Sequence, residues 1–161
     1  MNNEKNNVAN YINSYVRKYY NSDQKIMILG NGDISKETYK ILNQYTNVDV
    51  YSFRDNKNKI LSIIKDYDII IDCIASKNEH FYNFDFFKNL KENAIFIHIS
   101  KSTIKINDLY LCLKKFNKNI KIISDTLLDN KYTLQRLSNF KEVILTEHIA
   151  YKYNEPLSMM R

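Results

Sequence analysis

Along the chain, short continuous runs of apolar residues alternate with longer segments of mixed apolar and polar residues. Short apolar runs predict buried parallel strands, because strands that are covered on both faces read as continuous hydrophobic segments. These runs occupy residues 26–29, 48–53, 68–74, 94–99, 120–123 and 143–145. Between them lie segments with the length and polarity of crossover helices, at residues 37–45, 57–65, 82–90, 107–116 and 132–137.

The first twenty residues carry a different signal. Val8, Ile12, Tyr15, Val16 and Tyr19 recur at helical spacing and predict an amphipathic helix that stops at residues 21–23. Strand and helix then alternate, which predicts the α/β class: a doubly wound parallel sheet of about six strands, with right-handed crossovers and helices on both faces. We expect an N-terminal helix over residues 1–24 and one α/β domain over residues 25–161.

Composition and charge narrow the picture. At 161 residues and 19.2 kDa the chain can bury one sizeable core. Its net charge of +6 comes from lysines interleaved with acidic residues, which favours solvated faces over a nucleic-acid surface. Cys73 and Cys112 lack metal-ligand spacing and suggest reduced thiols. Since neither a signal-peptide core nor a membrane-spanning run is visible, we expect a cytoplasmic protein without a membrane partner or a bound metal.

Both glycines of the chain, Gly30 and Gly32, follow the first apolar run. In open α/β sheets the ligand crevice lies outside the carboxyl ends of the strands. Gly30 would allow the tight turn there, and Gly32 would let phosphates approach the helix amides, with Asn31, Asp33 and Ile34 as neighbours. Against this, the third position of a G-x-G-x-x-G pattern is Ser35. Asp33 places a carboxylate where a pyrophosphate would lie, and it could instead cap the helix of a turn that binds nothing.

A ribose-binding residue is expected about twenty residues further on, at the end of the second strand. Arg54 at that position would suit the 2′-phosphate of NADP, and Asp55 would suit the hydroxyls of NAD. The sequence leaves the register open between them. A charged loop tip without a ligand is the alternative.

The run Thr-Glu-His-Ile-Ala, residues 146–150, stands at the end of the last predicted strand. It resembles the Thr-Pro-His motif of the D-isomer-specific 2-hydroxyacid dehydrogenases, with His148 at the catalytic histidine. The segments DYDIIIDCIASKNEH, FFKNLKENAIFIHISKSTIKINDLYLCLKK and IKIISDTLLDN resemble the family's preceding segments in the same order. The resemblance covers most of residues 25–150. It implies a Rossmann-like domain that binds NAD or NADP, with Ala75 and Asp125 among the cofactor-binding residues.

The departures from the family pattern concern the chemistry. The family's catalytic arginine falls on Lys101, so a planar guanidinium is replaced by a point charge, and its neighbouring glycine falls on Ser102. The glutamate that orients the family's histidine lies in a stretch where Asp129 could stand in, with a shorter arm. The family also places a substrate domain before the first dinucleotide-binding strand, where this sequence has one helix.

Three functions follow from these observations. The first is an NAD(P)-dependent oxidoreductase acting on a small 2-oxo or 2-hydroxy acid, with His148, Lys101 and Asp129 as catalytic residues. The second is a non-catalytic dinucleotide-binding module or a subunit whose partner supplies a substrate domain. A methyltransferase is a third, which the histidine after the last strand disfavours. We also expect a homodimer through the N-terminal helix, whose tyrosine-rich face lacks a preceding domain to cover it.

Each residue that carries these functions also has an ordinary structural interpretation. His148 could simply cap a strand end, and Lys101 could be a solvated turn residue. His80 and His98 are more typical of ordinary loop and strand histidines than of ligands.

Overall fold

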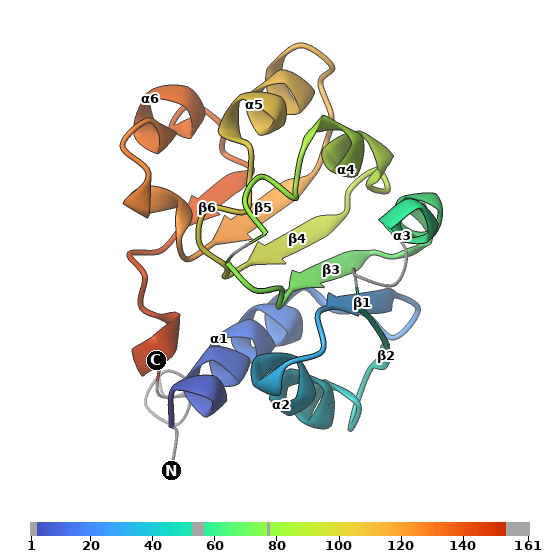
Figure 1. The fold of residues 1–161 in the computed structure, drawn as a ribbon. Coiled ribbons are helices and arrows are strands. Elements are labelled where there is room, and N and C mark those ends of the chain that lie inside the picture. Colours follow the sequence, from blue (N-terminus) through green and yellow to red (C-terminus); the bar gives the residue numbers. More distant parts are fainter. Residues whose placement is uncertain (1–2, 53–56, 77, 154–161) are drawn as a thin grey trace.

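The computed structural model describes residues 3–52, 57–76 and 78–153 of the chain (Figure 1). Within these ranges six parallel strands form one sheet: β1 (Lys25–Leu29), β2 (Asn47–Tyr51), β3 (Ile69–Asp72), β4 (Ile95–His98), β5 (Lys121–Ser124) and β6 (Val143–Leu145). The α-helices are α1 (Asn3–Tyr19), α2 (Asp33–Leu42), α3 (Lys57–Ile63), α4 (Phe84–Asn89), α5 (Ile106–Lys114) and α6 (Thr133–Leu137). Short 3-10 turns are η1 (Ile64–Asp66), η2 (Leu127–Asp129) and η3 (Ala150–Lys152). The predicted Rossmann-like fold is confirmed.

The strand order is β2-β1-β3-β4-β5-β6, and every neighbouring pair is parallel. From β1 the chain moves outward to β2, and then crosses to the other side of β1 to form β3. This reversal creates a topological switch point beside the carboxyl ends of β1 and β3, which is where ligands bind in open α/β sheets.

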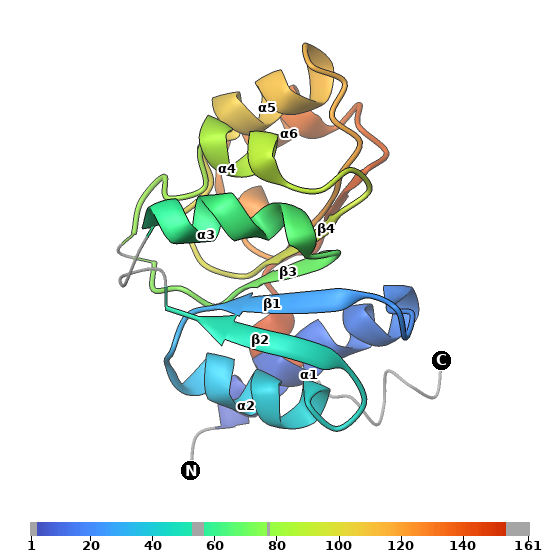
Figure 2. The ribbon, with the colours of Figure 1, turned by 90° about the vertical axis from the view of Figure 1, so that its right-hand side faces the viewer.

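Helices cover both faces of the sheet, with α1 and α2 on one face and α3, α4, α5 and α6 on the other (Figure 2). All four residues of β3 are buried, and so are all four of β4. Ile69 and Ile71 face the α1 side, whereas Ile70 packs into the opposite cluster. This burial on two faces explains why the strands read as continuous apolar runs in the sequence.

The apolar face of α1 is covered by the protein itself, which corrects the reason given above for a dimer through this helix. Val8, Tyr11, Ile12 and Val16 are buried in the same cluster as the isoleucines of the sheet. The helix also packs against α2 and against η3 near the carboxyl end of the described chain. The 3.6-residue period thus predicted an apolar face correctly, but the partner of that face is the sheet.

Element borders differ from the predicted ones by a few residues. Among the crossover helices the largest difference is α2, which starts at Asp33 immediately after the glycine turn, four residues before the predicted start. Among the described helices, none combines the length and the apolar character of a membrane span. In the same ranges no group of three or more histidine, cysteine or acidic side chains is arranged to hold a metal.

Candidate functional site

The turn after β1 holds both glycines, and the first is required by the packing of the sheet. Gly30 has a φ of +125°, a conformation that residues with a side chain rarely adopt. A Cβ atom on Gly30 would lie 2.3 Å from the carbonyl oxygen of Cys73, the residue that follows β3. Gly30 therefore lets the ends of β1 and β3 approach each other at the switch point.

Gly32 differs from Gly30, because no protein atom beyond its immediate chain neighbours lies within 4 Å of the position that its Cβ would occupy. Its φ of −86° is accessible to other residues, so neither packing nor backbone conformation requires a glycine here. Gly32 is the N-cap of α2 and offers no side-chain bond to the helix amides. The open space beside it is what a phosphate needs in order to approach the start of a helix.

A cavity of about 410 Å³ lies beside this turn, a size within the range of small-molecule sites. Six of the residues predicted to bind the cofactor line it: Gly30, Asn31, Gly32, Asp33, Ile34 and Ala75. The predicted ribose-binding residues Arg54 and Asp55 lie outside the described residues. A dinucleotide fits the described part of this site, because the turn combines an open glycine with helix amides that lack a side-chain cap.

Asp33 does not cap α2, contrary to the structural alternative. It is the first residue of the helix, and its side chain is 72% exposed and lies 4.0 Å from Lys5 Nζ. Lys5 of α1 also lines the cavity, and sequence analysis missed it because a lysine near the start of a helix is an ordinary surface feature. Ser35, at the third glycine position, is buried and donates a hydrogen bond to the Gly30 carbonyl at 2.7 Å. The turn is thus tied to its helix by a side chain.

The three residues predicted to be catalytic line a second cavity of about 380 Å³ at the same edge of the sheet. Lys101 comes from the loop after β4, Asp129 ends η2 after β5, and His148 follows β6. His148 Nδ1 lies 3.1 Å from Asp129 Oδ2, with side-chain exposures of 36% and 43%. Parallel strands deliver their carboxyl ends to one edge, which is why residues so distant in sequence meet here.

Two of the loops around this cavity are held in the left-handed backbone region. Ser102 has a φ of 59°, and His148 has a φ of 57°. Ser102 falls where the resemblance places a glycine, so the turn keeps a conformation that glycine favours even though a serine occupies it. Each such residue costs of order 1–3 kcal/mol and persists when its surroundings fix it. Hydrogen bonds that buried carboxylates accept from the neighbouring backbone and hydroxyl groups supply that constraint.

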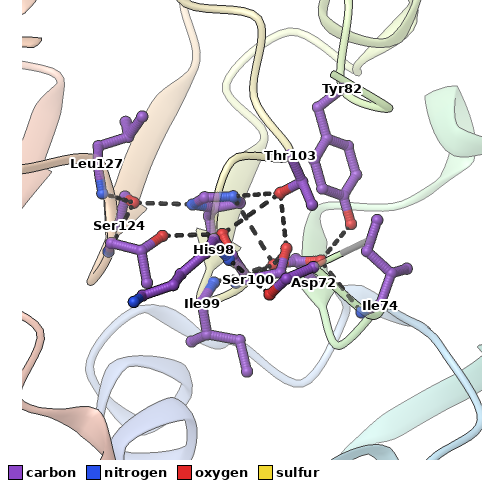
Figure 3. A network of polar contacts seen from close by, with 12 residues as sticks. Asp72, Ile74, Tyr82, His98, Ile99, Ser100, Thr103, Ser124 and Leu127 are labelled. Atoms are coloured by element: carbon purple, nitrogen blue, oxygen red, sulfur yellow. Dashed lines mark hydrogen bonds and ion pairs between the residues drawn. The ribbon is translucent and has the colours of Figure 1, made fainter. Parts of the chain in front are cut away.

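The first of these carboxylates belongs to Asp72, the fully buried last residue of β3 (Figure 3). Its Oδ2 accepts hydrogen bonds from Ile99 N at 3.0 Å, Ser100 N at 2.8 Å and Ser100 Oγ at 2.6 Å. Its Oδ1 accepts from Tyr82 Oη at 2.5 Å and from Ile74 N at 3.2 Å. Five donors therefore satisfy the charge and hold the residues that lead to Lys101.

His98 belongs to the same buried network and also lines the second cavity. Its Nδ1 lies 2.8 Å from Ser124 Oγ, and its Nε2 lies 2.7 Å from Thr103 Oγ1. Burial lowers the pKa of His98 to about 4, although the charges of Asp72 and Asp125 act in the opposite direction. The ring is therefore neutral near pH 7, and His98 joins β4 to β5 rather than acting as a charged group.

Asp125 lies apart from the other residues predicted to bind the cofactor. Its side chain is 1% exposed, and its oxygens accept hydrogen bonds from Thr146 Oγ1 at 2.5 Å, Ile149 N at 2.9 Å and Ala150 N at 2.8 Å. It does not line either of the two cavities. Sequence analysis also passed over Asp72, although a charged residue at the end of a wholly buried strand is an unusual feature that could have marked it.

Comparison with protein families gives a match to the NAD binding domain of the D-isomer specific 2-hydroxyacid dehydrogenases over residues 4–150. The family description agrees with the expectation of NAD or NADP as cofactor. No curated protein matches the chain.

Solved structures of dehydrogenases share the fold at low identity. An NADPH-dependent glyoxylate/hydroxypyruvate reductase from Sinorhizobium meliloti, in complex with citrate, is 16% identical with a TM-score of 0.69, and 88% of this chain covers 50% of that one. A second reductase of that description from the same organism is 12% identical with a TM-score of 0.73, over 92% of this chain and 73% of that one. A D-isomer specific 2-hydroxyacid dehydrogenase from Xanthobacter autotrophicus Py2, in complex with NADPH and MES, is 12% identical with a TM-score of 0.72. The match covers 93% of this chain and 77% of that one.

At these identities the solved structures establish the fold, and the chain spans half of the first reductase. The family match covers most of the sequence and confirms the resemblance seen in its motifs. The chain belongs to the D-isomer specific 2-hydroxyacid dehydrogenase family, as a form of its NAD binding domain.

Proposed function

We propose that this protein binds NAD or NADP at the glycine turn and acts as an oxidoreductase on a small 2-oxo or 2-hydroxy acid. The observation that supports this most directly is the grouping of His148, Asp129 and Lys101 around one cavity. That cavity lies at the same sheet edge as the turn of Gly30 and Gly32. Substrate and cofactor would therefore meet at the carboxyl ends of the strands.

The residues of the chain suggest distinct roles in that reaction. A proton on His148 Nδ1 can be donated to Asp129 Oδ2 at 3.1 Å, which fixes the tautomer and leaves Nε2 for the substrate oxygen. Lys101 would attract the carboxylate or the polarised carbonyl of the substrate. The bound cofactor would supply or accept the hydride.

The alternative is a dinucleotide-binding module whose substrate half belongs to another domain or chain. Two observations favour it: His148 and Asp129 are more than a third exposed, and Lys101 replaces the bidentate arginine. Exposed charges act through water and stabilise a transition state less than charges in a dry cavity. We therefore expect the isolated chain to bind the cofactor but to show weak turnover or none.

The assembly and location of the chain are further proposals. A homodimer would use what α1 leaves exposed, such as Glu4, Asn6, Arg17 and Lys18, because its apolar face lies against the sheet. We also propose a cytoplasmic location and a partner that supplies a substrate domain. For the domains, we propose a division into an N-terminal helix, residues 1–24, and an NAD(P)-binding domain, residues 25–161. Light scattering of the intact chain tests the dimer; a monomer at tens of micromolar contradicts it.

Binding is tested by thermal shift with NAD, NADH, NADP, NADPH and S-adenosylmethionine. A ligand that binds the native state raises the melting temperature in proportion to the logarithm of its concentration. We expect a shift with the nicotinamide dinucleotides. A shift with S-adenosylmethionine alone would favour the methyltransferase, and the absence of any shift would contradict the proposal.

Catalysis is tested by screening 2-oxo acids with NADH and NADPH. If wild-type turnover is measurable, we expect His148→Ala to lower it by ~10²-fold or more, the usual scale of lost acid–base catalysis. His80→Ala is the matched control, because His80 is an exposed loop histidine that does not line this cavity. Turnover that is unchanged in His148→Ala would remove the histidine from the mechanism, and binding without turnover would favour the module.

A further inference from the structure

One buried carboxylate contacts the loop that carries His148 on both sides of the histidine. Asp125, directly after β5, is 1% exposed. Its Oδ1 accepts hydrogen bonds from Thr146 Oγ1 at 2.5 Å and Ile149 N at 2.9 Å, and its Oδ2 accepts from Ala150 N at 2.8 Å. The three donors lie on both sides of His148 in the sequence. Asp125 thus holds the loop before and after the histidine.

The hydrogen-bond chain continues to the N-terminal helix. Tyr11 Oη and Thr146 Oγ1 are 2.7 Å apart. A threonine hydroxyl has one proton, and Thr146 donates it to Asp125, so Tyr11 is the donor to Thr146. Asp125 therefore links β5, α1 and the loop after β6 in one buried network.

This arrangement offsets the cost of the backbone conformation at His148. A φ of 57° is an unfavourable conformation for a histidine, and the hydrogen bonds that Asp125 accepts from the Ile149 and Ala150 amides hold the backbone beside it. With its backbone fixed in this way, the imidazole faces Asp129, which comes from the same β5–α6 segment as Asp125. One segment therefore supplies both the carboxylate that fixes the loop and the carboxylate that contacts the ring.

We propose that Asp125 is a positioning residue for His148. It does not contact the cofactor, although the family resemblance implies a cofactor-binding role for it. Both of its oxygens already accept hydrogen bonds from the loop, and almost none of its surface is exposed. Its effect on catalysis rests on the proposed function, whereas its effect on the loop can be measured without a substrate.

The first test is Asp125→Asn studied by NMR. An amide replaces one of the two acceptor oxygens by a donor, so an NH₂ group must face either Ala150 N or Ile149 N and Thr146. We expect hydrogen exchange at the Ile149 and Ala150 amides to accelerate by at least ~10-fold relative to a core amide such as that of Ile97. The ring signals of His148 are readily assigned among three histidines and should shift as well.

Matched variants separate positioning from general destabilisation. Asp108→Asn alters a different carboxylate, which is partly buried and accepts a hydrogen bond from Phe84 N, and should leave the two amides and the His148 ring unchanged. Asp129→Asn should shift the ring but leave the amides protected. If Asp125→Asn fails to fold, Thr146→Val removes one donor at similar volume and should shift the ring signals in the same direction. Unchanged amides and ring signals in Asp125→Asn, or in Thr146→Val where that variant must replace it, would overturn the proposal.

The second test separates positioning from cofactor contact. With Asp125→Asn we expect the dissociation constant for NADH to stay within about threefold, and kcat to fall by at least ~10-fold, because small displacements of a reacting group cost that much or more. A loss of NADH affinity as large as the loss in kcat would show cofactor contact and overturn the proposal. An inactive wild type would contradict the proposed enzyme, and the NMR measurements would still decide the role of Asp125.

Discussion

The two cavities lie along one edge of the sheet, but the chain builds them in different ways. The cavity at the glycine turn consists largely of backbone, with open space at Gly32 and an exposed carboxylate at Asp33. The cavity around His148 is backed by the buried side chains of Asp72, His98 and Asp125. The difference implies that the open residues of the first cavity, Gly32 and Asp33, affect binding with little effect on folding, whereas the side chains behind the second belong to the core.

Asp72 connects the two regions. It accepts a hydrogen bond from Ile74, which lines the first cavity, and three from Ile99 and Ser100, which precede Lys101. Removing a buried carboxylate that has several donors is costly, because the donors are left without an acceptor in a region that water does not reach. The network therefore fixes the geometry between the two cavities.

The largest effect is expected for Asp72→Ala. Removing this carboxylate leaves the Ile99 and Ser100 amides and the Tyr82 hydroxyl buried without an acceptor, which should lower the free energy of unfolding by about 3–5 kcal/mol. Asp33→Ala removes the exposed carboxylate of the other cavity and should change it by less than about 1 kcal/mol. Urea denaturation measures both. Similar losses in the two variants would remove the distinction between the cavities.

The pH dependence of stability provides a second comparison, through His98. Its pKa is about 4 in the folded protein and near 6.5 in the unfolded chain, so the unfolded chain binds the proton first as the pH falls. His98 should therefore lower the free energy of unfolding by about 3 kcal/mol between pH 6.5 and pH 4, with no change above or below that window.

Denaturation curves of His98→Asn should show a shallower pH dependence in this window than those of wild type. His80→Asn is the control, because His80 is exposed and asparagine tolerates its φ of 57°. An identical slope in wild type and His98→Asn would contradict the assignment of a buried neutral histidine.

The glycines should respond in opposite ways to substitution. Gly30→Ala places a Cβ 2.3 Å from the Cys73 carbonyl oxygen and should lower the free energy of unfolding by at least ~2 kcal/mol. Gly32→Val has open space and should change stability by less than about 1 kcal/mol while weakening NADH binding at least ~10-fold by blocking the helix amides. Denaturation and thermal shift measure the two effects. Unimpaired NADH binding by Gly32→Val would contradict phosphate approach at that position.

The fold could be predicted because buried parallel strands leave continuous apolar runs and the helices between them leave polar segments of helical length, and both signals are local in the sequence. The sequence also singled out Gly30 and Gly32, because glycines directly after an apolar run indicate a turn at the carboxyl end of a strand, where ligands bind in open α/β sheets. It could not predict the network of Asp72, His98 and Asp125, because those contacts depend on which strands are neighbours. The sheet that covers α1 escaped prediction for the same reason, since periodicity reveals an apolar face but not its partner.

The smallest effect is expected at Lys5, where the N-terminal helix reaches the cofactor cavity. Lys5 Nζ lies 4.0 Å from Asp33 Oδ2 beside the start of α2, so it can neutralise that carboxylate and attract a phosphate. Lys5→Gln should weaken NADH binding by about two- to fivefold, as expected for a partly exposed charge, and the difference should shrink at high salt. Lys18→Gln removes an exposed lysine from the last turn of the same helix and should leave NADH binding unchanged. Titration calorimetry at low and high salt measures both variants. Equal affinities of Lys5→Gln and Lys18→Gln at low salt would show that α1 contributes packing and no charge to the cavity.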